Sequence, residues 1–154
     1  MTRLLSLDLG TQCGWAVFAD GHRVASGTWN LSGSRFEGGG MRYLRFERHL
    51  TDALPGVTVV AFEEVRRHAG TTAAHVYGGL LAILTKTCEL AGVPYVGIPV
   101  ATIKKCATKL GNAGKDRMIA AAIGRFGLEP NQVDDNEADA LFVGVAALNE
   151  LGRK

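Results

Sequence analysis

The sequence predicts an α/β fold in which a mixed five-stranded sheet is flanked by helices on both faces. Two observations indicate this fold class. Short apolar runs fill the first third of the chain, and an Asp-Gly pair separates two of them, which is typical of antiparallel strands. Stretches with helical period then alternate with two further apolar runs, the pattern of parallel strands joined through helices.

Three antiparallel strands are expected in the first third of the chain. Residues 3–9 alternate between leucine and other side chains, which is the period of a strand with two different faces. Further apolar runs follow at 14–18 and 24–31. Because Asp20 and Gly21 lie between these runs, they predict a tight hairpin turn. The three strands therefore form a meander.

Helices and strands alternate after a glycine-rich loop at 32–40. The run VTVVAF at 57–62 is apolar and rich in β-branched residues, so we expect a strand that is buried on both faces. Another strand is expected at 94–98. The expected helices cover residues 41–54, 72–91, 101–110, 115–126 and 134–151.

Size and composition are those of one folded domain spanning residues 1–154. With 47% hydrophobic and 21% charged residues, the composition is that of globular rather than disordered proteins. No apolar run reaches the roughly 20 residues of a membrane span, and no signal-peptide cleavage site follows the N-terminus. The 3 cysteines include no C-x-x-C pair, so neither a disulfide nor a zinc site is expected. We therefore expect a cytoplasmic protein without a membrane partner.

Positive charge is concentrated in one segment of a nearly neutral chain. The 17 Lys and Arg residues exceed the 15 Asp and Glu residues by only two. Between residues 101 and 118, however, basic residues outnumber the single acid, Asp116. Such a segment binds an anionic partner such as nucleic acid, or forms a solvated helix face. Its basic residues are Lys104, Lys105, Lys109, Lys115 and Arg117.

Asp8 places a carboxylate in the middle of an apolar strand. A buried carboxylate is costly in free energy unless it is protonated, paired or bound to a cation. Glu63 and Glu64 follow the VTVVAF strand, and the strand pattern alone does not choose between them because neither face is polar. Asp135 and Asp139 are spaced four apart and so lie on one face of the last helix.

These acids are expected to share one pocket. If the strands at 3–9 and 57–62 are neighbours and the last helix crosses the same face, three or four carboxylates converge. Oxygen ligands without histidine or cysteine suit Mg²⁺ or Mn²⁺ rather than zinc. Two such ions activate water and stabilise the leaving oxygen of a phosphodiester. A different role is expected for Asp134, which with Glu137 has the spacing of a capping box.

Four motifs extend over nearly the whole chain. They are SLDLGTQCGWAV, AFEEV, IPVATIKKCATKLGNAGK and DDNEADAL. Together they resemble the RuvC family of Holliday junction resolvases, and in particular its small bacteriophage members. The resemblance implies the RNase H-like fold and a homodimeric, Mg²⁺-dependent crossover junction endonuclease with two ions per site, for which Mn²⁺ can substitute. Such an enzyme cuts branched DNA by paired symmetric nicks and leaves 5′-phosphates, and a phage-encoded one would act in the host cytoplasm.

The resemblance also implies roles for individual residues. Asp8 and Asp139 match catalytic acids of the family, and Lys104 matches a catalytic lysine. The register of the second motif selects Glu63 over Glu64. The helix at 72–91 corresponds to the region where family members make their dimer contact. The residues expected to bind DNA are Arg66, Arg67, Lys104, Lys105, Lys109 and Lys115.

The last motif departs from the family pattern at one position. Family members usually have an acid or a histidine three residues before the final acid, where this chain has Asn136. Asp135 lies one residue earlier. The resemblance therefore leaves open whether Asp135, by its charge, or Asn136, through its amide oxygen, completes the metal site.

Three other functions are compatible with parts of the sequence. A YqgF-like RNase has a similar first motif but does not need the basic third segment. The chain is also compatible with a junction-binding protein that has lost catalysis, because Asn136 replaces the acid or histidine usual in the family. The D-x-G-T pattern that begins at Asp8 also occurs in actin-like ATPases and sugar kinases, but that fold needs two such domains and one chain of 154 residues does not supply both.

Overall fold

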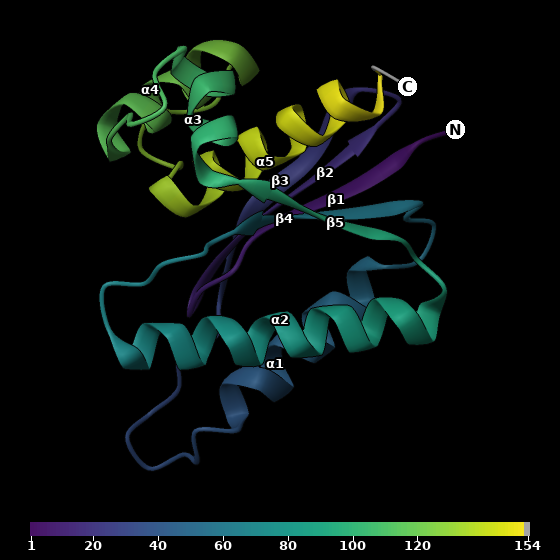
Figure 1. The fold of residues 1–154 in the computed structure, drawn as a ribbon, viewed down its shortest axis with the longest axis vertical. Coiled ribbons are helices and arrows are strands. Elements are labelled where there is room, and N and C mark those ends of the chain that lie inside the picture. Colours follow the sequence, from purple (N-terminus) through teal and green to yellow (C-terminus); the bar gives the residue numbers. More distant parts are fainter. Residues whose placement is uncertain (153–154) are drawn as a thin grey trace.

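The computed structural model describes residues 1–152 and contains one five-stranded sheet between two layers of helices (Figure 1). The strands are β1 (Arg3–Asp8), β2 (Gln12–Ala19), β3 (His22–Asn30), β4 (Val59–Glu64) and β5 (Tyr95–Pro99). The helices are α1 (Met41–Ala53), α2 (Thr71–Ala91), α3 (Val100–Thr108), α4 (Lys115–Phe126) and α5 (Asp135–Leu151). No helix within residues 1–152 combines the length and apolar character needed to cross a membrane.

The sheet is mixed, as the sequence predicts. Its strand order is β3-β2-β1-β4-β5. The first three strands pair antiparallel, whereas β4 pairs parallel with both β1 and β5. Asp20 and Gly21 both have positive φ angles, 47° and 83°, which is the backbone of the tight turn that the Asp-Gly pair predicts.

The two faces of the sheet support separate hydrophobic cores. Alternate residues of β1 point to opposite faces, so Leu5 and Leu7 join the core beneath α1 and α2, and Leu4 joins the core beneath the other three helices. Figure 1 shows α1 and α2 on one side of the sheet and α3, α4 and α5 on the other. The prediction of helices on both faces is confirmed.

Helix α5 lies directly on β1 and β2, the strands that carry the first of the four sequence motifs. A Cβ added to Gly14 of β2 would overlap the backbone of Asn136, so β2 and the first turn of α5 approach as closely as glycine allows. Ser6 of β1 is fully buried and donates a hydrogen bond of 2.7 Å to the carbonyl oxygen of Ala140. These contacts fix the start of α5 against β1 and β2.

The start of α5 has half of the predicted capping box. The side chain of Asp134 accepts a hydrogen bond from the backbone N–H of Glu137 at 2.8 Å. The carboxylate of Glu137, however, does not return to its own helix, because it accepts a hydrogen bond of 2.7 Å from the Ser26 hydroxyl of β3. Asp134 also accepts a hydrogen bond from the Thr28 hydroxyl at 2.8 Å. The cap therefore joins α5 to the edge strand.

Candidate metal centre

Strand register brings the first two acids together. In the parallel pair of β1 and β4, Leu7 lies opposite Phe62, and the next residues along the two strands are Asp8 and Glu63. Side chains alternate between the faces of a strand, so both acids point to the α5 face, whereas Glu64 points to the α1 and α2 face. The structure thus places Glu63, and not Glu64, beside Asp8.

Asp139 reaches the same point from α5. One carboxylate oxygen from each of Asp8, Glu63 and Asp139 lies within 4.8 Å of the other two, and all three residues are half-buried. Three elements that are distant in sequence therefore supply one cluster of acids at the end of β1 and β4.

The cluster raises the pKa of Asp8 and of Asp139 in the absence of a cation. Burial, a hydrogen bond to Glu63 and the negative charges of Glu63, Asp139 and Asp135 raise the pKa of Asp8 well above its usual range. Burial and the charges of Glu63 and Asp135 raise the pKa of Asp139 to about 7, although Lys104 and Lys115 oppose this shift. The folded chain without metal thus retains protons on the carboxyl groups of Asp8 and Asp139 at a pH where the unfolded chain has released them.

We expect the contribution of Asp139 to the stability of the metal-free protein to fall as the pH rises from about 4 to about 7. In this range the folded Asp139, with its pKa of about 7, holds a proton that the unfolded chain has released. The proton on Asp139 therefore stabilises the folded chain fully at a pH below the pKa of this group in the unfolded chain. This stabilisation is lost as the pH rises past the pKa of about 7 in the folded chain. At pH 8 without metal, Asp139→Asn should raise the free energy of unfolding by about 1–3 kcal/mol.

Urea denaturation in EDTA at pH 4, 6 and 8 measures this effect, with Asp116→Asn as the control because Asp116 is exposed on α4. Adding Mg²⁺ at pH 8 should stabilise the wild type but not Asp139→Asn, because the variant lacks one ligand of the site. An Asp139→Asn variant whose free energy of unfolding differs from that of the wild type by the same amount at pH 4 and at pH 8 in EDTA would contradict the prediction.

The residues of the cluster fit a hard divalent cation. All three ligand groups are carboxylates, and their mutual repulsion is what a cation would offset. Mg²⁺ and Mn²⁺ prefer such oxygen ligands, whereas zinc sites normally contain histidine or cysteine. Within residues 1–152 no other group of three or more His, Cys, Asp or Glu side chains meets the same distance test.

The two candidates for a fourth ligand lie at the edge of the cluster. Asp135 is near enough to raise the pKa of both Asp8 and Asp139, but one of its oxygens lies 3.0 Å from the Nζ atom of Lys115. Asn136 contributes its backbone to the close approach of β2 described above. Asp135 does not belong to the group of three carboxylates whose oxygens converge.

Of the basic residues predicted to bind DNA, Lys104 and Lys115 lie close enough to the cluster to affect the pKa of Asp139. Lys115 pairs with Asp135, and Arg66 Nε lies 3.7 Å from an oxygen of Glu64. Lys104 is half-buried and close enough to Asp139 to lower its pKa. The others form no ion pair within 4.0 Å in the part of the chain that the structure describes; they are Arg67, Lys105 and Lys109, all exposed.

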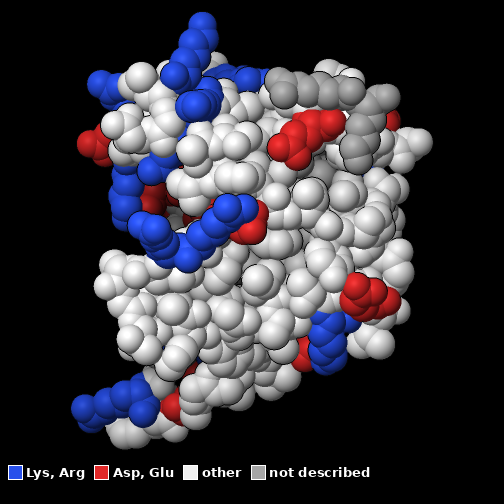
Figure 2. Space-filling model, in the orientation of Figure 1, with Lys and Arg blue, Asp and Glu red and all other residues white. Residues whose placement is uncertain are grey.

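Figure 2 shows how these charges are distributed on one face. Acidic side chains are visible in the floor of a hollow at the left of the molecule, in the region where Figure 1 places the start of α5. Lys and Arg side chains border the hollow. A hollow with an acidic floor and a basic rim holds cations at its base and a polyanion at its edge.

Two side chains that support the acids escaped prediction. The Tyr77 hydroxyl of α2 donates a hydrogen bond to the backbone oxygen of Glu63 at 2.9 Å and accepts one from the N–H of Val65 at 3.1 Å. Ser6 lies on the same face of β1 as Asp8 and holds α5 one residue after Asp139. The sequence offers an indication for Ser6, because it is a polar residue within an apolar strand. It offers no indication for Tyr77, because the contact of Tyr77 with Glu63 depends on how α2 packs.

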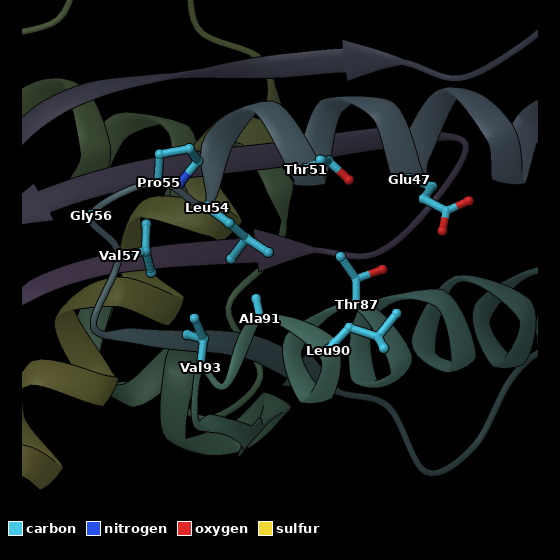
Figure 3. Close-up of a pocket in the computed structure, with 10 residues that line it drawn as sticks. All are labelled: Glu47, Thr51, Leu54, Pro55, Gly56, Val57, Thr87, Leu90, Ala91 and Val93. Atoms are coloured by element: carbon cyan, nitrogen blue, oxygen red, sulfur yellow. The ribbon is translucent and has the colours of Figure 1, made fainter.

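An apolar cavity of about 580 Å³ lies elsewhere, between the end of α1 and the end of α2 (Figure 3). Leu54, Val57 and Val93 form part of its wall. Glu47 at its margin is neutralised by Lys86, with Nζ and the carboxylate oxygen 2.8 Å apart. None of the predicted catalytic acids lines this cavity, so it does not contribute to the candidate metal centre.

The fold is similar to that of solved RuvC structures. RuvC of Thermus thermophilus in complex with a Holliday junction substrate has a TM-score of 0.80 at 21% identity, over 99% of this chain and 97% of that chain. A second structure of Thermus thermophilus RuvC has the same TM-score and identity, over 98% and 97% of the two chains. The yeast mitochondrial Holliday junction resolvase Ydc2 has a TM-score of 0.65 at 14% identity, over 94% and 77%.

No protein-family profile matches the chain, and no curated protein matches its sequence. At the identities of the solved structures, the similarity establishes the fold. The prediction of an RNase H-like fold of the RuvC type, made from the four motifs, is confirmed.

Proposed function

We propose that this chain is an Mg²⁺-dependent endonuclease that resolves four-way DNA junctions by paired, symmetric nicks. The observation that carries the proposal is the convergence of Asp8, Glu63 and Asp139 within a basic rim, on the fold of RuvC. Thermus thermophilus RuvC was solved with a Holliday junction substrate, which supports the same substrate class for this chain.

Asp8, Glu63 and Asp139 would hold the cations, two per site, with Mn²⁺ able to replace Mg²⁺. Asp135 or Asn136 would complete the site, Asp135 only after its pairing with Lys115 is released. The bound ions supply a water nucleophile at neutral pH and positive charge opposite the phosphoryl oxygens. The half-buried position of the carboxylates restricts bulk water around them, which strengthens these interactions.

The side chains around the acids bind and orient the phosphate. Lys104 contributes positive charge where negative charge develops on the phosphoryl oxygens. A water oxygen forms the new bond to phosphorus while the bond to the 3′ oxygen breaks, so the products carry a 5′-phosphate and a 3′-hydroxyl. The exposed Arg67, Lys105 and Lys109 contact the DNA backbone and make affinity dependent on salt.

Two copies of the chain would act together, because paired nicks need two sites related by a two-fold axis. We expect the contact along α2. Its exposed positions include the small residues Ala73, Gly78 and Ala82, which allow two helices to approach closely. Gly79 has a different role, since a Cβ there would overlap the ring of Tyr43 on α1.

Incubation of a synthetic four-way junction with the protein and Mg²⁺ tests the proposal. We expect nicks at symmetric positions in two strands of like polarity, ligatable products, and no cleavage in EDTA. A linear duplex of the same sequence should be cut at least ~100-fold more slowly, because branch shape rather than base contacts selects the substrate.

Each other outcome identifies an alternative. Cleavage of single-stranded RNA with an intact junction would favour a YqgF-like RNase. Tight junction binding with no nick at any Mg²⁺ or Mn²⁺ concentration would favour a binding protein without catalysis. Either result would overturn the proposed nuclease function.

A further inference from the structure

The loop between β3 and α1, residues 31–40, carries an exposed pair of side chains that the fold does not need. Phe36 is 84% exposed, and the guanidinium carbon of Arg35 lies 4.8 Å from the centre of its ring. The contact orders Arg35 without neutralising its charge. An exposed guanidinium that is already ordered is a group that binds the phosphates of nucleic acid.

The loop is held in a defined shape. Arg45 donates two hydrogen bonds to the carboxylate oxygens of Glu37, at 2.6 and 2.7 Å. The fully buried Leu31 donates its backbone N–H to the carbonyl oxygen of Thr11 at 2.8 Å. Because Thr11 follows Asp8 by three residues, this hydrogen bond joins the root of the loop to the segment that leaves the metal centre.

A second arginine at the base of the loop has no anionic partner. The Nε atom of Arg42 is enclosed, and no hydrogen-bond acceptor meets it in the part of the chain that is described. Arg42 lines a cavity of about 210 Å³ formed with the glycines of the loop. Glu37, the acid in that cavity, is already engaged by Arg45. Because no carboxylate of the described residues pairs with Arg42, its guanidinium charge is available to an anion that enters this cavity from outside the chain.

The loop lies on the side of the molecule where the metal centre opens. Figure 1 shows it at the lower left, below the point where β1 and β4 end and on the same side as the start of α5. In Figure 2 a basic side chain projects from this lower-left region, separated by neutral surface from the basic rim of the hollow. A rigid duplex that leaves the metal centre in this direction would pass over the loop.

We propose that Arg35 and Arg42 of the β3–α1 loop bind the phosphate backbone of a duplex arm, away from the branch point and the scissile phosphate. This inference rests on the proposed junction-nuclease function. Only an arm that is long and double-stranded would then reach the loop, whereas cleavage would take place at the metal centre. Phe36 serves to hold the Arg35 side chain toward the arm.

Binding measured in EDTA, where no cleavage occurs, tests this contact. The probes are four-way junctions with arms of about two helical turns and with arms of about half a turn. We expect Arg35→Ala with Arg42→Ala to weaken binding of the long-armed junction roughly 10-fold and to lower its salt slope by about one to two. Binding of the short-armed junction, and its nicking rate in Mg²⁺, should stay within about 2-fold of wild type.

Arg48→Ala is the matched control, since Arg48 is exposed on α1 and forms no ion pair within the described residues. If replacement of the half-buried Arg42 unfolds the chain, the single variant Arg35→Glu is used instead, because Arg35 is exposed. It should likewise weaken binding of the long-armed junction more than binding of the short-armed one. Unchanged affinity for long arms, or an equal loss for both arm lengths, overturns the inference. Failure of the wild type to bind either junction would refute the proposed function instead.

Discussion

Glu63→Gln should reduce junction nicking by at least ~100-fold, whereas Glu64→Gln should leave the rate within about 3-fold of wild type. The two acids are adjacent in the sequence, but only Glu63 faces Asp8 and Asp139. Glutamine keeps the size of the side chain and removes the charge that holds a cation. Single-turnover nicking of a four-way junction in Mg²⁺ measures the rates.

Binding provides the second readout for this pair. Glu63→Gln should bind the junction at least as tightly as wild type in EDTA, because the variant repels phosphate less. Asp8→Asn and Asp139→Asn should behave in the same way. Equal losses of nicking in the Glu63 and Glu64 variants would mean that the orientation of β4 does not determine the site.

Gly14→Ala should destabilise the chain by about 3 kcal/mol and remove nicking activity from the fraction that still folds. The added Cβ would overlap the Asn136 carbonyl, and backbone cannot move aside as a side chain can. The first turn of α5 must then lift from β2, which carries Asp139 away from Asp8. Urea denaturation and nicking per folded molecule measure the two effects separately.

Gly124→Ala is the control for this variant. Gly124 is exposed on α4, and nothing lies within 4 Å of an added Cβ. Alanine there should raise the free energy of unfolding by roughly 0.5–1 kcal/mol, because it is the better helix former. If Gly14→Ala nicked junctions at the wild-type rate, the close contact of β2 with α5 would not be needed to position Asp139.

Local pattern was enough to predict the secondary structure. The Asp-Gly turn, the apolar VTVVAF run and the helical spacing after residue 41 each depend on residues close in sequence, and all correspond to elements of the structure. The differences occur at element ends. Helix α3 stops at Thr108, two residues before the expected end, because Lys109 adopts a left-handed backbone with φ of 64°.

The sequence predicted that Asp8, Asp139 and an acid after the VTVVAF strand share one pocket, but its pattern did not show which acid of the Glu63 and Glu64 pair faces that pocket. Asp8 and Asp139 drew attention because each is an acid among apolar neighbours. The choice of Glu63 over Glu64 needed family resemblance, since a strand buried on both faces has no polar side in its sequence. The structure supplies the missing information through the pairing of β1 with β4, which is a contact between distant segments.

Contacts between distant segments also explain what the sequence did not indicate. The spacing of Asp134 and Glu137 predicts a capping box, but it does not indicate that Ser26 of β3 takes the Glu137 carboxylate. In the same way, nothing near Gly14 in the chain indicates that α5 crosses there. Such contacts depend on how the helices pack, which local residue patterns do not encode.

The crowding of Asp8 with Glu63 and Asp139 has an evolutionary consequence. Because the pKa values of Asp8 and Asp139 are raised, we expect a neutral residue at either position to stabilise the ion-free chain, so a lineage that no longer cut DNA would gain by such a replacement. Under the proposed nuclease function, all three acids are kept because the cation site needs each of their carboxylates.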